Sequence, residues 1–212
     1  MENNSFIITV NREAGSGGGD IAKIVGELLG VKVYDKEILS GIRKQYHLTE
    51  DQIEQIKAKK ASWWSEFCRF YKQFGSAADG ADESSEVNSL QLYYEEAKIL
   101  KALANQESCV ILGRTGFHIF KDYPNAMRIF ITANKDVRAK WIMKKFDLDV
   151  NKAIKKMEEI DTARENYTKT FANVSRYDAR NYDLCINVSG FTPEQVAHFI
   201  ANNVRLKYSE DK

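Results

Sequence analysis

The amino-acid sequence predicts an α/β fold built on a five-stranded parallel sheet, and three observations lead to this prediction. Five short apolar segments with many β-branched residues indicate buried strands. Longer stretches with helical spacing of apolar residues separate them, as expected where helices connect parallel strands. A glycine-rich stretch at 14–20 follows the first apolar segment, where α/β proteins commonly bind phosphate groups. With 212 residues, the chain is long enough for one such domain with an inserted lobe.

The first elements form the β-loop-α-β unit with which parallel sheets commonly begin. A strand is expected at 6–10, where Phe-Ile-Ile-Thr-Val ends at the glycine-rich stretch. Apolar residues recur at helical spacing over 21–29, and Gly30 ends that helix because glycine readily adopts the left-handed conformation. A second strand follows at 31–34.

The middle of the chain, about 36–105, is predicted to be mostly helical. Aromatic residues between 63 and 74 recur at helical spacing and indicate core packing within this segment. A platform for a nucleobase and a dimer contact are the alternatives. Small and acidic residues at 75–89 predict a loop, and a further helical pattern covers 90–104.

The last third of the chain contains the remaining strands and two helical stretches. Strands are expected at 109–112, 128–132 and 184–188. A long charged stretch at 136–170 is predicted to be helical, with Asp147 and Asp149 marking a break. Thr192 and Pro193 indicate the start of the last helix, because proline is favoured at the first helical position.

Charge and composition exclude several classes of protein. The chain has 31 Lys and Arg residues against 30 Asp and Glu, so it lacks the basic excess of a nucleic-acid-binding protein. Hydrophobic residues make up 43% of the chain, which excludes global disorder. The three cysteines form no CxxC motif, and the histidines have no metal-ligand spacing. We therefore expect neither a disulfide framework nor a metal site made of these residues.

The same residues give an expectation for location. No apolar run approaches the ~18 residues that a membrane helix needs. The N-terminus also lacks the basic and apolar regions of a signal peptide. We expect a cytoplasmic protein with no membrane partner and no nucleic-acid partner.

The glycine-rich stretch permits three interpretations. The dinucleotide fingerprint G-x-G-x-x-G fits Gly15 and Gly17 but needs a third glycine where Asp20 stands, although Asp35 lies about where a ribose-binding acid would fall. The P-loop pattern G-x-x-x-x-G-K-[ST] needs Lys and Ser/Thr where the chain has Gly18 and Gly19. These changes remove a phosphate-binding cation and a magnesium ligand. A tight turn without a ligand is the third interpretation.

An ordered series of short motifs runs along most of the chain. It comprises Ile8 to Glu13, Gly15-Ser16-Gly17-Gly18, Ile21-Ala22-Lys23, Val33 to Glu37, Val110 to Arg114, Val137-Arg138-Ala139, Asp161-x-x-Arg164 and Tyr182-Asp183-Leu184. In this order the motifs resemble the cytidylate kinase-like family, a divergent branch of the nucleoside monophosphate kinases. The resemblance is weakest over residues 45–90.

The resemblance implies a three-layer P-loop NTPase fold and a phosphoryl-transfer reaction. A single domain would cover 1–212, with a helical substrate-binding insert at 36–105 and a lid at 140–175. ATP, with Mg²⁺, would donate its γ-phosphoryl group to CMP or dCMP. Nucleoside mono- and triphosphates are therefore the expected partners.

The resemblance also implies roles for individual residues. Arg114 matches the arginine that holds the acceptor monophosphate, and Asp161 with Arg164 resembles a pair that closes over the acceptor nucleotide. Arg138 corresponds to the arginine at the start of the helix that leads to the lid. Arg138 and Arg164 would neutralise charge during transfer. The donor phosphates would lie on Gly15, Ser16, Gly17, Gly18 and Gly19.

Some of these residues have simpler explanations. Asp35 follows the second strand and is expected either to assist magnesium or the acceptor, or to cap the next helix. Asp161 and Arg164 are three positions apart, so an intrahelical ion pair also explains them. Arg114 could form a surface salt bridge. The lysines at 140–156 form either a solvated helix face, a lid that contacts ATP, or an RNA-binding surface.

The altered phosphate loop leaves a second function open. A protein of this fold that binds a nucleotide or another phosphate ligand, and has lost transfer, would not need the missing Lys and Ser/Thr. If transfer is retained, Arg12, Lys23 or a lid residue would supply the missing cation. A nicotinamide-dependent oxidoreductase is a third and weaker possibility, which rests on Asp35 alone.

Overall fold

The structure is a computed structural model that describes residues 5–35 and 83–208. The chain divides into two compact units, one formed by 1–36 with 100–212 and the other by 37–99. The aromatic stripe at 63–74 lies outside the described residues, as does most of the predicted insert. Helix α5 (Glu83–Ala104) begins in the second unit and ends in the first.

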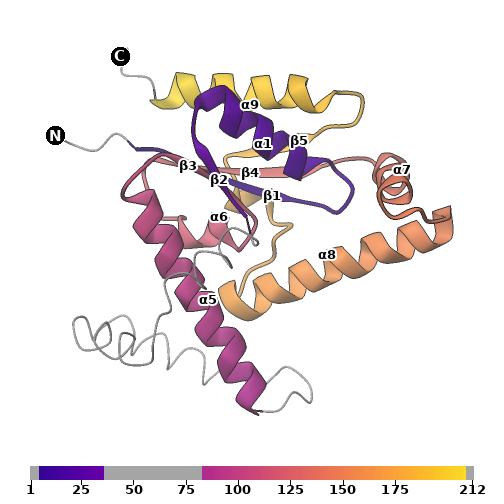
Figure 1. Ribbon diagram of the computed structural model, residues 1–212, viewed down its shortest axis with the longest axis horizontal. Coiled ribbons are helices and arrows are strands. Elements are labelled where there is room, and N and C mark those ends of the chain that lie inside the picture. The colour runs from indigo at the N-terminus through magenta and orange to yellow at the C-terminus, as the bar shows by residue number, and fades with distance from the viewer. Residues whose placement is uncertain (1–4, 36–82, 209–212) are drawn as a thin grey trace. The chain divides into compact units, whose positions relative to one another are not determined.

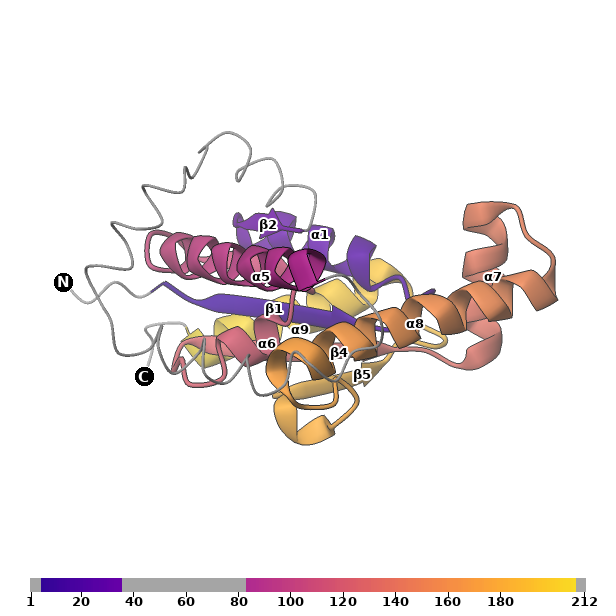
Figure 2. The same ribbon diagram turned by 90° about the horizontal axis from the view of Figure 1, so that it is seen from below.

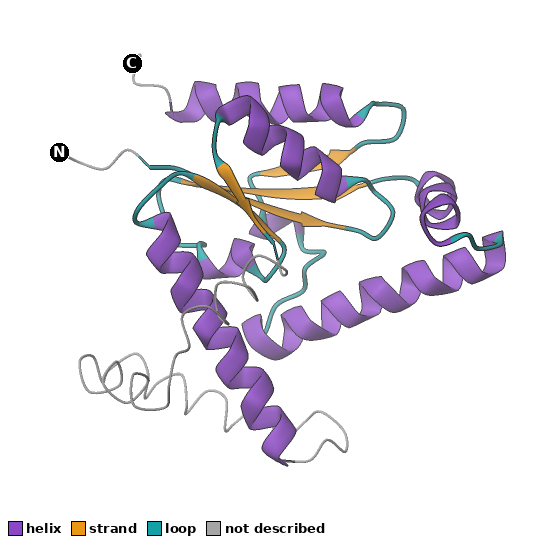
Figure 3. Ribbon diagram, viewed as in Figure 1, coloured by secondary structure: helices purple, strands orange, loops and turns teal. Residues whose placement is uncertain are grey.

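The first unit contains a sheet of five parallel strands, which confirms the prediction (Figures 1 and 3). The strands are β1 (Ile7–Arg12), β2 (Lys32–Tyr34), β3 (Cys109–Leu112), β4 (Ala126–Thr132) and β5 (Leu184–Asn187). Their order is β2-β3-β1-β4-β5, so the first strand is the central one. Val10 of β1 pairs with Leu112 on one side and Ile129 on the other. The chain crosses over β1 between β3 and β4, and parallel sheets bind ligands at such a switch point.

Helices α1 (Gly18–Leu29) and α9 (Pro193–Tyr208) lie side by side on one face of the sheet (Figure 1). They cover the largest hydrophobic cluster, in which Ile8 and Val10 are buried. The short helix α6 (Gly116–Ile119) lies on the opposite face. Together these layers place the carboxyl end of β1 at the centre of the structure, beside the glycine-rich loop.

Close packing of α6 depends on its first residue. A Cβ at Gly116 would lie 3.0 Å from Cγ2 of Ile111 and 3.4 Å from Cβ of Thr9. Glycine therefore allows α6 to approach the sheet more closely than a larger residue would. Beyond it, Phe117, Phe130 and Tyr182 form a second small cluster of buried aromatic side chains.

The charged stretch forms two helices, α7 (Lys135–Phe146) and α8 (Val150–Ala172), which pack against each other (Figure 2). The break between them is confirmed at the predicted aspartates. Asp147 ends α7 with a left-handed φ of 52°, and Asp149 caps α8 by accepting a hydrogen bond from the backbone N–H of Lys152 at 2.9 Å. The predicted lid region, 140–175, contains most of this helix pair.

The ends of two other helices also follow the residue types. Gly30 ends α1 with a left-handed φ of 66°. The α9 helix begins at Pro193, and Thr192 and Gln195 form a reciprocal capping box in front of it. Among the described residues, the structure contains no helix with the length and apolar content needed to cross a membrane.

One sequence-based expectation is wrong. Residues 75–89 were expected to form a loop, but α5 begins at Glu83. The acidic residues that suggested a loop are favourable in the first turns of a helix, where they meet the positive end of the helix dipole. The last loop-favouring glycine of this stretch is Gly80, which precedes the helix.

Candidate functional site

The glycine-rich loop connects β1 to α1 and ends in a helix N-terminus. Gly15 and Gly17 have φ values of 79° and 71°, which only glycine adopts without strain. The carbonyl oxygen of Gly17 accepts hydrogen bonds from the N–H groups of Asp20 and Ile21, at 3.0 and 3.1 Å. Helix α1 therefore starts at Gly18, and the first N–H groups of a helix have no acceptor within it. Such groups favour a bound anion.

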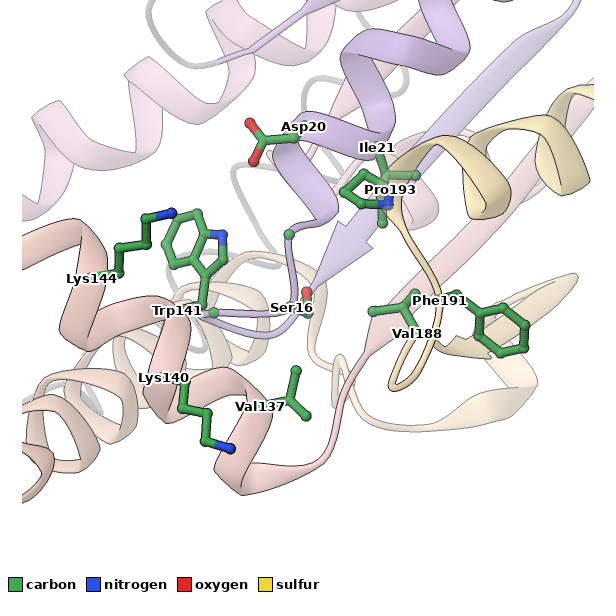
Figure 4. Close-up of a pocket in the computed structure, with 12 residues that line it drawn as sticks. Ser16, Asp20, Ile21, Val137, Lys140, Trp141, Lys144, Val188, Phe191 and Pro193 are labelled. Carbon is green, nitrogen blue, oxygen red and sulfur yellow. The ribbon is translucent and has the colours of Figure 1, made fainter.

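The loop faces a cavity of about 340 Å³ (Figure 4). Lys140 and Lys144, one helical turn apart on α7, carry the cationic side chains that line it. Trp141 and Phe191 contribute aromatic rings, and Phe191 is 62% exposed. The other lining residues are Gly15, Ser16, Gly17, Asp20, Ile21, Val137, Val188 and Pro193. Three of the predicted phosphate-binding residues thus border a cavity of the size that small ligands occupy.

Helix α7 approaches the loop at its backbone. A Cβ at Gly15 would lie 2.4 Å from the carbonyl oxygen of Arg138. Nε of Arg138 donates to the carbonyl oxygen of Ala14 at 2.8 Å, and its Nη1 forms an ion pair with Glu13 at 3.0 Å. Arg138, which was predicted to neutralise charge during transfer, is 9% exposed. Its contacts bind it to the residues at the start of the loop.

Asp161 of α8 is the centre of a buried ion cluster. Its side chain is an ion-pair partner of Arg138, of Arg176 at 3.3 Å and of Arg164 at 3.7 Å. It also accepts a hydrogen bond from the backbone N–H of Ala14 at 2.9 Å. The intrahelical pair with Arg164 is present but is the longest of these contacts. In this structure Asp161 holds the glycine loop rather than facing open solvent.

Arg176 was not identified from the sequence. Its side chain is completely buried, and it lies in the segment that follows α8. It donates hydrogen bonds to the carbonyl oxygen of Arg12 and to Asp161, and its guanidinium lies 5.0 Å from the centre of the Tyr177 ring. Its Nε has no hydrogen-bond partner among the residues that the structure describes. No motif marks this arginine, because its role depends on where folding places it, including its contact with Arg12, 164 positions away.

Arg114 stands at the carboxyl end of β3 in a strained turn. Gly113, Arg114 and Thr115 all have left-handed φ values, of 78°, 53° and 52°. For residues other than glycine this conformation costs about 1–3 kcal/mol, and such strain clusters at functional sites. The guanidinium of Arg114 lies 4.9 Å from the centre of the Tyr167 ring, on α8. The arginine is thus presented at the ligand-binding edge of the sheet.

Arg12 ends β1 and brings a further positive charge to this edge. Arg12 is half-buried, and its guanidinium lies against Gly113. Burial, followed by the charges of Arg164 and Arg176, lowers the pKa of Arg12 to about 9. The charge of Asp35 acts in the opposite direction and raises this pKa. Asp35 therefore belongs to the same edge.

The predicted site residues fall into three groups around the loop. Gly15, Ser16 and Gly17 border the cavity, whereas Arg12, Asp35 and Arg114 surround the carboxyl ends of β1 and β3. Asp161, Arg138 and Arg164 connect α7 and α8 to the loop. Among the described residues, no three His, Cys, Asp or Glu side chains are grouped closely enough to hold a metal ion by themselves.

Comparisons with known proteins identify a matching family model and a similar protein. A model of the cytidylate kinase-like family matches residues 7–190. Cytidylate kinase of Archaeoglobus fulgidus is 28% identical over 204 residues, covering 94% of this chain and 95% of that protein.

Two solved structures share the fold. An uncharacterized protein from Eubacterium ventriosum superposes with a TM-score of 0.70 at 24% identity, covering 95% of this chain and 99% of that one. Shikimate kinase from Acinetobacter baumannii, in complex with shikimate, gives a TM-score of 0.51 at 12% identity, covering 97% and 96% of the two chains. At these identities the likeness shows the fold alone, which is the three-layer fold of the P-loop kinases.

Proposed function

The chain belongs to the cytidylate kinase-like family, and we propose that it transfers the γ-phosphoryl group of ATP to CMP or dCMP. A nucleotide kinase-like function follows from the family, while the donor and the acceptor are part of the proposal. The observation that carries it is the position of the glycine loop, whose residues line the cavity and whose Gly18 lies next to Arg12 of the arginine-lined edge. A transfer reaction needs such adjoining sites for donor and acceptor.

The cavity is the proposed donor site. The phosphates of ATP lie on the loop at the N-terminus of α1, where N–H groups and the helix dipole favour negative charge. Lys140 and Lys144 add positive charge from α7. The nucleoside lies among Trp141, Val188 and Phe191, because flat apolar surfaces suit a nucleobase.

The arginine-lined edge is the proposed acceptor site. Arg114 binds the monophosphate, for which a guanidinium provides two parallel hydrogen bonds. Arg12 lies between this position and the loop. Segments that would recognise the base fall largely outside the described residues, so cytidine as the acceptor base is proposed from the family alone.

Transfer requires one bond to form and one to break. An oxygen of the acceptor monophosphate bonds to the γ-phosphorus of ATP, and the bond from this phosphorus to the bridging β–γ oxygen breaks, leaving ADP. The chain's own residues position the two nucleotides and neutralise the charge on the moving group. Arg12, Arg114 and Arg164 are the arginines assigned to this role, and Arg138 positions the loop through Ala14.

The described residues fit magnesium held mainly by phosphate oxygens. Mg²⁺ in kinases keeps several waters and takes one or two carboxylates besides the substrate phosphates, so no larger acidic cluster is needed. Asp20, which lines the cavity, and Asp35, at the edge near Arg12, are the carboxylates that would hold it. When bound, the ion neutralises charge on the β- and γ-phosphates.

A second candidate is a nucleotide- or phosphate-ligand-binding protein of the same fold without transfer activity. Glycine at positions 18 and 19 favours it, because the loop lacks the lysine and hydroxyl of the P-loop pattern. It predicts binding of Mg·ATP with no product from any acceptor. Free Cys109 and Cys185 are consistent with the reducing cytoplasm, which we propose as the location in either case.

The two functions are separated by measuring transfer from Mg·ATP to a panel of nucleoside monophosphates, with the products quantified by chromatography. We expect CDP or dCDP to form, and to disappear in an Arg114→Ala protein run alongside. Equal product from that variant would indicate a contaminating kinase. Binding of Mg·ATP without transfer to any acceptor would contradict the kinase and favour the binding protein.

A further inference from the structure

The phosphate loop departs from the P-loop pattern at both of its ends. With Gly17 as the last glycine of G-x-x-x-x-G-K-[ST], the first glycine falls at position 12 and the lysine at position 18. The chain has Arg12 and Gly18 at these positions. A glycine has become an arginine at one end, and the lysine is replaced by glycine at the other.

The two residues that depart from the pattern, Arg12 and Gly18, lie next to each other in the structure. A Cβ at Gly18 would lie 2.7 Å from Cβ of Arg12 and 3.0 Å from its Cγ. Both of these atoms are close to the backbone of β1, and they cannot move away as the tip of a flexible side chain could. No residue with a side chain, lysine included, therefore fits at 18 while Arg12 occupies this position.

The neighbouring glycine shows that the crowding is specific to position 18. Among the residues that the structure describes, a Cβ at Gly19 would meet only Cδ2 of Leu112, at the ordinary contact distance of 3.9 Å. Glycine at 19 is therefore not required by packing. Space for a Cβ is therefore lacking at 18 but present at 19. Glycine at 18 is explained by the close approach of Arg12, and not by a general need for glycines in a tight turn.

The side chain of Arg12 runs from the donor loop to the acceptor edge. It starts beside Gly18, at the beginning of α1, and a Cβ at Gly113 would lie 2.4 Å from its Nη1. Gly113 directly precedes Arg114, the proposed acceptor arginine. The guanidinium thus lies between the N-terminus of α1 and the residue that would hold the acceptor phosphate.

The backbone of Arg12 is fixed from the other side. Its carbonyl oxygen accepts hydrogen bonds from Nη2 of Arg176 and from Nη1 of Arg164, the latter at 3.1 Å. Arg176 is completely buried, so this anchor is rigid. Burial, followed by the charges of Arg164 and Arg176, lowers the pKa of Arg12, which indicates that its positive charge is incompletely balanced by the protein. A bound anion would restore the balance.

We propose that Arg12 supplies from strand β1 the cation that the P-loop lysine supplies from helix α1, and that Gly18 is the change that makes room for it. This inference rests on the proposed function and specifies one of its parts. Arg12 contacts the γ-phosphate as it passes from donor to acceptor, while Arg176 is a positioning residue that holds the Arg12 backbone. Lysine at 18 and arginine at 12 are then two alternative ways to supply a cation to the phosphates, and the chain has room for one of them at a time.

The test separates the charge of Arg12 from its bulk. Arg12→Gln keeps the Cβ and Cγ that crowd Gly18 but removes the charge, whereas Arg12→Gly removes both. Gly18→Ala is compared with Gly19→Ala as the matched control, and Arg12→Gly/Gly18→Lys moves the cation to the position in the P-loop pattern. Thermal unfolding of each protein is measured, together with calorimetric affinities for Mg·ATP and Mg·ADP.

Charge and crowding give distinct expectations. Arg12→Gln should unfold close to wild type and lose about 10- to 100-fold in affinity for Mg·ATP, the range expected for a hydrogen bond to a charged group, with a smaller loss for Mg·ADP. Gly18→Ala should lower the unfolding temperature while Gly19→Ala does not. The double variant Arg12→Gly/Gly18→Lys should bind Mg·ATP better than Arg12→Gly alone.

The outcomes that overturn the inference differ from those that overturn the proposed function. Wild-type protein that binds no Mg·ATP would overturn both. Wild-type binding that Arg12→Gln leaves intact, or an equal loss for Mg·ATP and Mg·ADP, would overturn the role of Arg12 while the kinase stands. Equal unfolding temperatures for Gly18→Ala and Gly19→Ala would overturn the steric pairing of Arg12 with Gly18.

Discussion

The carboxylate of Asp161 accepts a hydrogen bond from the backbone N–H of Ala14 at 2.9 Å, across 147 positions of the sequence. The same carboxylate pairs with Arg138 and Arg176. One buried side chain of α8 therefore fixes the first residue of the glycine loop and balances two arginines. The glycine loop owes its position to these distant residues as well as to its own glycines.

Asp161→Asn should destabilise the protein strongly. The amide can still accept the hydrogen bond from Ala14, but it leaves Arg176 without its buried counter-charge and Arg138 with Glu13 alone. Breaking a buried ion pair in this way costs about 3–5 kcal/mol in the free energy of unfolding. Urea denaturation measures the loss, with Glu159→Gln on the exposed side of α8 as the control. A normal unfolding midpoint combined with a raised KM for CMP would instead assign Asp161 to the acceptor.

Gly15→Ala and Gly17→Ala should differ in stability although both glycines have left-handed φ values. At Gly17 no described residue lies within 4 Å of an added Cβ, so only the backbone strain of about 1–2 kcal/mol is expected. At Gly15 the added Cβ would also lie 2.4 Å from the carbonyl oxygen of Arg138, which must move. Chemical denaturation should show the larger loss for Gly15→Ala. Equal losses would contradict the close approach of α7.

Local sequence patterns were sufficient to predict the strands and most helix ends. The five strands are runs of apolar, β-branched residues, and Asp147 and Asp149 separate α7 from α8 by capping chemistry that acts within a few residues. The prediction of a loop at 75–89 was wrong because acidic residues are favourable at the start of a helix as well as in a loop. Residue type alone does not separate the two.

The candidate site was predictable only in part, because long-range contacts define the rest. The glycines and Arg114 stand next to strand ends, where a pattern can identify them. Arg176 carries no such mark, since its partners come from β1 and α8. The crowding of Gly18 by Arg12 is likewise a property of the folded loop, and the sequence indicated only that lysine was missing.

Arg12→Lys should make Mg·ATP binding depend on pH. Burial, then Arg164 and Arg176, lower the pKa of the group at this position, while Asp35 and Asp161 raise it. Lysine has an ordinary pKa of about 10.4, well below that of arginine, so the same surroundings bring it closer to neutrality. Raising the pH then removes its proton and its charge, and affinity falls. Titrations from about pH 6 to about pH 8.5 should show this fall in Arg12→Lys and a flat profile in wild type.

A pH profile that is flat in both proteins would show that lysine stays charged at this position. The surroundings of position 12 would then not lower the pKa of a cationic side chain there as far as argued above. Arg12→Gln serves as the control, because it has no titrating group at position 12 and its weak binding should not change with pH in this range.

Lys140→Ala/Lys144→Ala should weaken Mg·ATP binding and reduce its dependence on salt. Both lysines line the cavity and are exposed, so each contributes a screened interaction with the phosphates. A loss of about 2- to 30-fold for the pair is expected, because exposed charges are worth about 0.2–1 kcal/mol each. Binding at two or more salt concentrations measures both effects. The exposed Lys155→Ala on α8 is the control, and an equal loss there would indicate a general effect of net charge.

Gly19→Ser should strengthen the dependence of ATP binding on magnesium. Position 19 corresponds to the hydroxyl of the P-loop pattern, which binds the ion. In the described part of the chain, a Cβ there meets only Cδ2 of Leu112, at 3.9 Å. The added hydroxyl should therefore lower the Mg²⁺ concentration for half-maximal ATP binding without reducing stability. Gly19→Ala controls for the added Cβ, because it fills the same space without an oxygen ligand. Identical Mg²⁺ requirements for the two variants would mean that Asp20, Asp35 and the phosphates already complete the coordination of the ion.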